Sequence, residues 1–423
     1  MPGRVKVNQA DYYCTLHLHY CTLLLRWTGG GRAKRSVFSV HLTESVVMKE
    51  AHWWYLFMIP ALVLSVTACG CISPFLSSDP TADYPKVGSY EEDGRLATSY
   101  LAFTFQKSHI PVTVSVPQGL YEAASGAEKR AVLLGDWKED DDWITGYYLS
   151  FLTDPQMEQV YSATVDALRA GASGISESSD EYLEYLTVYV QSMAYDTSPD
   201  EAAPKFPVET IVETAGDCDD KSILLAGLLS REGYNVSLLY FPADSHMTVG
   251  IAADEPGFRG SGYLFIETTN VSLVGIPTKT FENGDLLTSD LFVIPVGNGT
   301  KGYGKIDETR RIDRAAAEAR SRAETKVPSL AVQNDELKLM KRALEQENDA
   351  LSRLRQSKDI QRYNVAVGDY NRHVTEYNQL LEEYRTSYDA YLTEVNFVNF
   401  VATHLSDRPG LSDAVTVWEH GLG

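Results

Sequence analysis

The sequence predicts an α+β protein with an N-terminal membrane segment and a C-terminal α-helical coiled coil. Three features lead to this prediction: an uncharged run near residue 60, a middle region that mixes β-branched stretches with helical repeats, and a long glycine-poor region with a heptad-type repeat. The chain has 423 residues, 44% of them hydrophobic. This length allows about two to four domains and at least one well-buried core.

The composition excludes two classes of protein. The 37 basic and 58 acidic side chains give a formal net charge of −21, which disfavours non-specific binding to nucleic acid or to an anionic bilayer. Five cysteines are too few to hold a chain of this length together by disulfides. Nucleic acid is therefore not an expected partner.

The uncharged run extends from Trp53 to Ala68, and on to Ile72 it reaches the length of about 20 residues that a membrane-spanning helix needs. Met48 stands just before it, and small residues lead from it into Cys69. This arrangement resembles a lipoprotein signal sequence with Cys69 as the lipidated residue, and an uncleaved anchor helix fits equally well. Both predict a chain tethered at the cell membrane, with most of its residues extracytoplasmic.

Residues 1–47 are interpreted as a start-site extension, because signal segments begin at an initiator methionine and this one begins at Met48. Their six basic and two acidic residues are opposite in balance to the rest of the chain. They also contain a compact group of possible zinc ligands, Cys14, His17, His19 and Cys21. Pairs so close together do not easily surround one tetrahedral ion, so no metal site is predicted.

The remaining chain divides by composition and periodicity. The predicted units are a signal or anchor at 48–72, a linker at 73–99, an N-terminal α/β part at 100–179, a core at 180–304, a helical coiled coil or hairpin at 305–405 and a tail at 406–423. Within them we expect strands over 100–116, 236–241, 247–252 and 263–268, helices over 155–170 and 181–194, and a solvated acidic loop at 139–142.

One predicted helix is better defined than the others. Gly216 and Asp217 form a turn and cap signal, Asp219 and Asp220 place negative charge in the first helical turn, and Gly233 is a natural stop. Between these signals the residues are apolar on most sides, which predicts a buried helix.

The coiled-coil prediction rests on eleven apolar or aromatic residues in unbroken 4–3 alternation, from Tyr363 to Val398. A shorter set from Leu337 to Leu354 follows the same rule with one gap and is out of phase with the first. A break near 356–362 is therefore expected. The two segments fit an antiparallel pair within one chain or a homo-oligomer formed through 330–402.

Three residues have the types needed for thiol catalysis. Cys218 lies at the N-terminus of the predicted helix, where backbone N–H groups and the helix dipole stabilise a thiolate. His246 begins a strand 28 residues later, and Glu267 lies on the next strand, 21 residues further on. They supply a nucleophile, a base and an acid that orients the base. Each residue taken alone also fits a structural role, and their order and spacing favour the catalytic one.

Residues 180–270 resemble the transglutaminase-like superfamily, particularly its archaeal and bacterial cysteine-peptidase-like branch. The resemblance is carried by five segments: Tyr195-Asp196, Phe206–Thr210, Gly216–Lys221, His246–Gly250 and Glu267–Thr269. It implies a papain/transglutaminase-like core with Cys218 as nucleophile, His246 as general base and Glu267 as orienting acid, a position at which the family commonly has Asp. It also suggests Tyr195 or Gln191 as an oxyanion donor. It implies no cofactor, and the sequence shows no calcium-site pattern.

Two functions follow as hypotheses. The first is a membrane-tethered thiol hydrolase or acyltransferase acting on amide bonds of an envelope protein or peptide. The second is a catalytically inactive envelope scaffold or binding module that assembles through the coiled coil.

Overall fold

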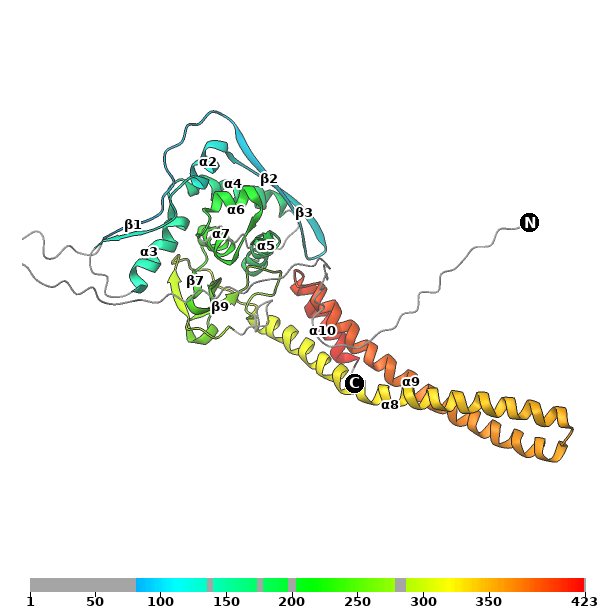
Figure 1. Cartoon of the computed structure of the whole chain (residues 1–423). Coiled ribbons are helices and arrows are strands. Elements are labelled where there is room, and N and C mark those ends of the chain that lie inside the picture. Colours follow the sequence, from blue (N-terminus) through cyan, green and yellow to red (C-terminus); the bar gives the residue numbers. More distant parts are fainter. Residues whose placement is uncertain (1–80, 135–139, 173–177, 197–202, 278–286, 422–423) are drawn as a thin grey trace, which may run out of the picture. The chain divides into compact units, whose positions relative to one another are not determined.

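The computed structural model describes residues 81–134, 140–172, 178–196, 203–277 and 287–421. All of them belong to one compact unit, Pro74–Gly423, and the other unit, Met1–Ser73, lies outside the described residues. The described chain is α+β (Figure 1). Up to the helix that carries Cys218, its elements are β1 (Thr81–Asp83), β2 (Leu96–Phe105), β3 (Ser108–Pro117), α2 (Gln118–Ser125), β4 (Val132–Leu134), α3 (Asp140–Thr153), α4 (Met157–Gly171), α5 (Ser179–Gln191), β5 (Ala194–Tyr195), α6 (Pro207–Glu213), β6 (Ala215–Gly216) and α7 (Cys218–Arg231).

The elements after α7 complete a sheet and then a helical region. They are β7 (Val236–Phe241), η1 (Pro242–Asp244), β8 (His246–Ala252), η2 (Phe258–Gly260), β9 (Tyr263–Ile266), β10 (Phe292–Pro295), α8 (Ile306–Ser357), α9 (Ile360–Thr403) and α10 (Arg408–His420). The main sheet has the order β10-β7-β8-β9, and each neighbouring pair is antiparallel. Three two-stranded pairs, β1-β4, β2-β3 and β5-β6, lie outside this sheet.

The register of the main sheet separates its two faces. Leu238 pairs with Val249, and Val249 pairs with Ile266, so these side chains share one face, and they belong to the main core together with the leucines of α7. Phe241 pairs with His246, and their rings stack on the opposite face with centroids 6.1 Å apart. Helix α7 packs on the first of these faces, with its N-terminus next to the start of β8, and the His246 ring lies on the second.

Helix α7 is buried on most sides, as its sequence predicts, from Ile223 to Leu229. Gly227 allows this close packing, because a Cβ there would lie 2.3 Å from the Tyr161 ring of α4. Arg231 of the same helix lies over this ring, with its guanidinium carbon 3.6 Å from the ring centroid. Around α7, the helices α3, α4, α5 and α6 complete the core that also contains the inner residues of β2 and β3.

Helices α8 and α9 pack against each other along their length as an antiparallel pair (Figure 1). The chain reverses at Lys358, which adopts a left-handed conformation with φ 60°, inside the interval where the two repeats change phase. The gap in the shorter apolar repeat is Glu347, and its carboxylate lies 2.7 Å from Nδ1 of His373 on α9. A polar pair within an apolar seam fixes the register of the two helices.

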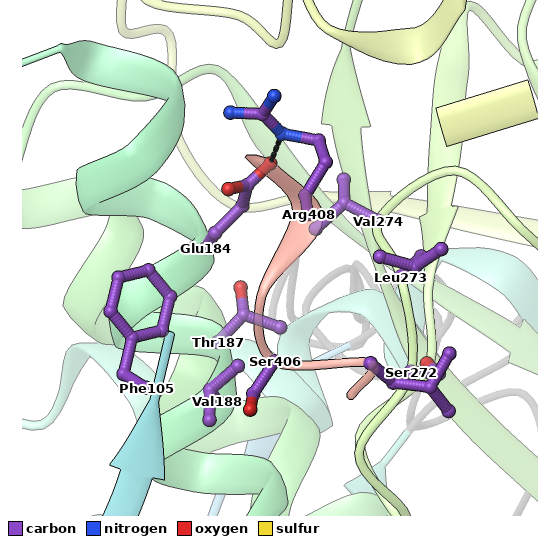
Figure 2. Close-up of a pocket in the computed structure, with 10 residues that line it drawn as sticks. Phe105, Glu184, Thr187, Val188, Ser272, Leu273, Val274, Ser406 and Arg408 are labelled. Carbon is purple, nitrogen blue, oxygen red and sulfur yellow. Dashed lines mark hydrogen bonds and ion pairs between the residues drawn. The ribbon is translucent and has the colours of Figure 1, made fainter. Parts of the chain in front are cut away.

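Helix α10 folds back onto the core and onto the base of the helical pair. Trp418 stacks on Phe397 of α9 at 4.8 Å between centroids. Arg408, only 4% exposed, donates from Nε to Glu184 of α5 at 2.5 Å, and its Nη1 lies 2.8 Å from Glu308 of α8. Figure 2 shows this ion pair beside a cavity of about 10 Å³, enough for roughly one water molecule. The hydroxyl of Tyr303 donates to the same Glu184 oxygen.

The predicted N-terminal membrane segment is a part of the fold class that has to be corrected. Among the described residues of 81–421, no helix combines the length and the apolar character needed to cross a bilayer. Residues 48–72, with the lipidation candidate Cys69, and the extension 1–47 lie outside the described residues. The fold class that the structure supports is α+β, with no membrane segment in the described part.

In three segments whose character was predicted from composition, the structure shows regular elements or packed residues. The predicted linker contains Val87, which is buried and donates its N–H to Asp154 at 2.8 Å, and it also contains the start of β2. The predicted tail, 406–423, contains the packed helix α10. The predicted acidic loop at 139–142 is in fact where α3 begins, at Asp140.

The Arg408–Glu184 pair gives a stability prediction. Arg408→Met is expected to lower the free energy of unfolding by about 3–5 kcal/mol, because it leaves a buried carboxylate without its cation. The double variant Arg408→Met/Glu184→Gln should regain part of this loss. Urea unfolding followed by circular dichroism measures both. Arg372→Met is the control, since Arg372 is 58% exposed and pairs only with exposed carboxylates, and a loss equal to that of Arg408→Met would contradict the prediction.

Candidate active site

Cys218 is the first residue of α7, and the local sequence explains why the helix begins there. The Asp217 carboxylate accepts hydrogen bonds from the backbone N–H groups of Asp219 and Asp220, while the Asp220 carboxylate accepts from the N–H of Asp217. This reciprocal cap satisfies N–H groups that the first turn leaves free. Gly216 is required for the approach, since a Cβ there would lie 2.6 Å from the Asp220 Cβ.

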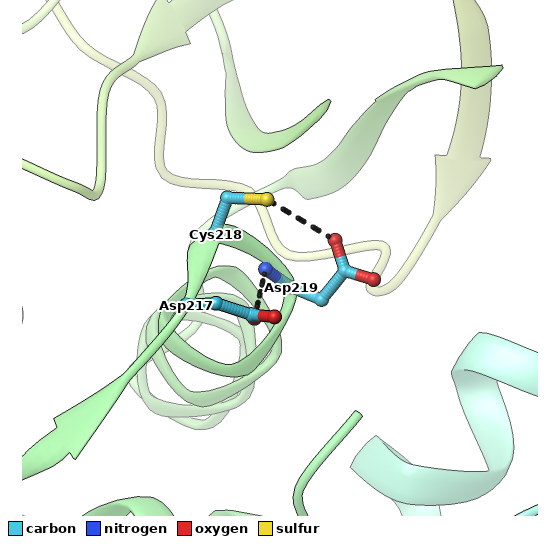
Figure 3. A group of neighbouring side chains, drawn as sticks. All are labelled: Asp217, Cys218 and Asp219. Atoms are coloured by element: carbon cyan, nitrogen blue, oxygen red, sulfur yellow. Dashed lines mark hydrogen bonds between the residues drawn. The ribbon is translucent and has the colours of Figure 1, made fainter. Parts of the chain in front are cut away.

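The Cys218 sulfur is buried and lies against the start of β8. It is 3.9 Å from the carbonyl oxygen of Ser245, the residue before His246. The backbone N–H of Met247, the residue after His246, donates to it. Its second neighbour is its own helix: the thiol donates to Oδ1 of Asp219 at 3.4 Å (Figure 3). The structure therefore brings the candidate nucleophile to the backbone on both sides of the candidate base.

These surroundings keep the thiol protonated. Burial raises the pKa of Cys218 well above its usual range, and the carboxylates of Asp219 and Asp217 raise it further, while the Met247 N–H lowers it by a smaller amount. Burial likewise raises the pKa of Asp219 to about 6, with Asp217 adding to the effect. The helix N-terminus alone does not produce a thiolate here.

His246 and Glu267 lie together, as their strands predict. Nε2 of His246 is 3.9 Å from Oε2 of Glu267, and the two side chains are 7% and 5% exposed. This separation is too long for a hydrogen bond. Burial lowers the pKa of His246, and Glu267 and Asp244 oppose this effect, so the imidazole is neutral at pH 7 and available as a base.

The Glu267 carboxylate is held by the turn that follows it. Its Oε1 accepts hydrogen bonds from the N–H groups of Thr268 and Thr269 and from the Thr269 hydroxyl, at 2.9, 3.0 and 2.9 Å. The other oxygen, Oε2, is the one that faces His246. A glutamate therefore presents an oriented carboxylate here by folding back onto its own backbone.

The two oxyanion candidates have different positions. Gln191 is 3% exposed, and its side-chain amide donates to the carbonyl oxygens of Glu267 and Ser272 while accepting from the Ser272 N–H. Because both groups of its amide are engaged with the turn after β9, Gln191 holds that turn, and its oxyanion role stays a prediction. Tyr195 is 46% exposed, and it pairs with Gly216 two residues before the cysteine. Its oxyanion role stays a prediction.

Three residues near the site, Lys221, Tyr148 and Tyr240, were not predicted from the sequence. Lys221 is fully buried, and its ammonium donates to three backbone carbonyls, those of Gln191, Met193 and Thr269. Tyr148 of α3 donates to Asp219 at 3.5 Å, and its ring lies 5.3 Å from that of Tyr240. Lys221 is recognisable from its spacing, one helical turn after Cys218 on a buried face, whereas nothing in the sequence connects α3 to Asp219.

Asp217, Cys218 and Asp219 are also the kind of group that can hold a metal ion, since one ligand atom from each lies within 4.8 Å of the others. Figure 3 shows why the group exists: Asp217 caps the helix through the Asp219 N–H, and Asp219 accepts the thiol. These bonds account for the arrangement without an ion. The cavity beside Arg408 and a larger groove of about 620 Å³ along β3 are not lined by Cys218, His246 or Glu267.

Comparison of the chain with protein-family models, with curated proteins and with solved structures found no match. The resemblance to the transglutaminase-like superfamily therefore stays a prediction from the sequence motifs.

The carboxylate beside the sulfur gives a prediction on reactivity. Asp219→Asn is expected to speed alkylation of Cys218 by iodoacetamide at pH 8 by about tenfold, because loss of one neighbouring negative charge lowers the thiol pKa by about one unit. Peptide mapping by mass spectrometry measures the rate at Cys218 separately from the other cysteines. Asp335→Asn, an exposed change on α8, is the control, and equal rates for wild type and Asp219→Asn would contradict the prediction.

The same carboxylate gives a prediction on pH dependence. Because the folded-state pKa of Asp219, about 6, exceeds its ordinary value of 3.8, the folded chain binds this proton more tightly than the unfolded chain. The contribution of Asp219 to stability is therefore present below pH 4 and is lost as the pH rises through 6. Asp219→Asn should remove this loss. Urea unfolding at pH 5 and at pH 7 measures how the free energy of unfolding changes from the lower to the higher pH. This change should be more positive for Asp219→Asn than for wild type, and an equal change in both proteins would contradict the assignment.

Proposed function

We propose that this chain is a thiol acyl-transfer enzyme that acts on amide bonds through Cys218, His246 and Glu267. The observation that carries the proposal is the joint placement of these residues: the sulfur lies against the backbone on both sides of His246, and Nε2 of His246 faces an oriented Glu267 carboxylate at 3.9 Å. This is the order of nucleophile, base and orienting group that thiol acyl transfer requires.

The raised pKa of Cys218 and the lowered pKa of His246 favour attack by a neutral pair. In this scheme the sulfur attacks the amide carbonyl carbon while the thiol proton moves to His246, and the imidazolium then protonates the leaving amine nitrogen. The thioester formed on Cys218 passes its acyl group to water or to an amine. Glu267 faces Nε2 and so favours a proton on that nitrogen, which leaves Nδ1 to accept the thiol proton.

The backbone N–H of Cys218 is the proposed oxyanion donor. As the first helical residue it has no acceptor within α7, and it belongs to the same residue as the nucleophile. Tyr195, exposed and paired with Gly216, is proposed as a second donor.

A second candidate function is an assembly module, and the α8–α9 pair favours it. The two helices contain 52 and 44 residues, and long helical pairs commonly serve to join subunits or partners. In this alternative the Cys218 region has only a structural role.

Acylation by a small activated ester separates the two candidates. Wild-type protein treated with p-nitrophenyl acetate is expected to acetylate Cys218 with a burst of p-nitrophenol. Cys218→Ala should abolish the modification, and His246→Asn should slow it by about 10²–10⁴-fold, because general-base assistance is lost. Peptide mapping by mass spectrometry identifies the acylated residue.

His109→Asn provides the control, since His109 is an exposed histidine on β3. Acylation of Cys218 at the same rate in His246→Asn as in wild type would overturn the enzymatic proposal and leave the assembly function.

A further inference from the structure

Lys221 is the residue in this region whose burial most requires explanation. Its side chain is fully buried, and burial lowers its pKa to about 8 while Glu267 opposes the effect. At pH 7 the group is therefore mainly an ammonium ion within the core. A buried charge persists only where its hydrogen bonds compensate for lost solvation, and here three backbone carbonyls do so, at 3.2, 3.0 and 3.1 Å.

The three carbonyls belong to two different segments. Those of Gln191 and Met193 lie at the C-terminal end of α5, where free carbonyls and the helix dipole favour a cation. The third belongs to Thr269, whose N–H and hydroxyl hold the Glu267 carboxylate. The ammonium thus connects α7 both to α5 and to the turn that carries the acid.

Other side chains support this arrangement. Gln191 reaches from α5 to the Glu267 and Ser272 carbonyls. Ser222, next to Lys221 on α7, donates to the Met247 carbonyl of β8 and shares a hydrogen bond with Thr268. Each of these bonds joins an element that carries one member of the site to an element that carries another.

We propose that Lys221 is a positioning residue of the active site: by holding the Thr269 carbonyl from one turn below Cys218, it fixes the turn that presents Glu267 to His246. The proposal rests on the proposed function of Cys218, His246 and Glu267. Helix α7 then sets the position of the nucleophile with its first residue and the position of the acid with its fourth.

The test reads the protonated nitrogen of His246 directly. In wild-type protein at pH 7, two-bond ¹H–¹⁵N correlation spectra of ¹⁵N-labelled full-length chain are expected to show His246 with its proton on Nε2, the nitrogen that faces Glu267. The signal is assigned by its loss in His246→Asn. Glu267→Gln should move both ring nitrogens toward intermediate shifts, because the carboxylate that favours one tautomer is gone.

Lys221→Met is expected to produce the same change as Glu267→Gln, and the double variant should show no further change. Lys221→Gln, whose amide can donate to two of the three carbonyls, should fall between wild type and Lys221→Met, and it provides the test if the methionine variant does not fold. The matched control is Lys129→Met, which loses a lysine ion pair of 2.7 Å to the buried Glu209 but contacts no residue of the Glu267 turn. It should keep the wild-type pattern despite lower stability.

The outcomes distinguish this proposal from the one on which it rests. If Glu267→Gln leaves the tautomer unchanged, the acid does not orient the histidine and the proposed Cys–His–Glu arrangement fails. If Glu267→Gln changes the tautomer while folded Lys221→Met or Lys221→Gln does not, only the positioning role of Lys221 is overturned. A change in Lys129→Met equal to that in Lys221→Met would show general destabilisation and would overturn it as well.

Discussion

The site depends on the register in which β8 pairs with β9. Val249 lies opposite Ile266, and side chains alternate along each strand, so His246 and Glu267 fall on the same face of the sheet. A slip of one residue would turn Glu267 toward α7 and expose an apolar neighbour in its place. The register is fixed by burial, because Val249 and Ile266 are fully buried in the main core. The buried contacts of Val249 and Ile266 therefore both stabilise the fold and place His246 and Glu267 on the same face of the sheet.

Helix α5 connects the site to the C-terminal helices. At mid-helix Glu184 binds Arg408 of α10 and Tyr303. At the C-terminal end the Gln191 amide binds the turn after β9, and the carbonyls of Gln191 and Met193 accept from Lys221. Both contacts are made by buried polar groups with several partners, and such groups define a geometry more narrowly than apolar packing does. The position of α10 and the position of the Glu267 turn are consequently set against one rigid element.

The sequence was most informative where a residue's role depends on its own element. The cap before Cys218, the buried helix after it and the three strands β7, β8 and β9 follow from local patterns, and so does the change of phase between α8 and α9. It was least informative where the role depends on distant contacts. Gln191 has the right chemistry for an oxyanion donor, and only the path of the turn after β9 shows that its amide is already engaged. Composition likewise suggested a tail at 406–423, because a short helix such as α10 gains its stability from the partners of Arg408 and Trp418 rather than from its own sequence.

The electrostatics of the sulfur constrain any mechanism at this site. A helix N-terminus favours a thiolate, but burial raises the pKa of Cys218, and the carboxylates of Asp219 and Asp217 raise it further. Asp217 caps α7, so removing its charge would weaken the helix that positions Cys218. In the proposed reaction the proton therefore leaves the thiol during attack rather than before it, and its acceptor has to be neutral at that moment. The buried His246, whose pKa is lowered, is the proposed acceptor and meets this requirement, whereas an imidazolium would not.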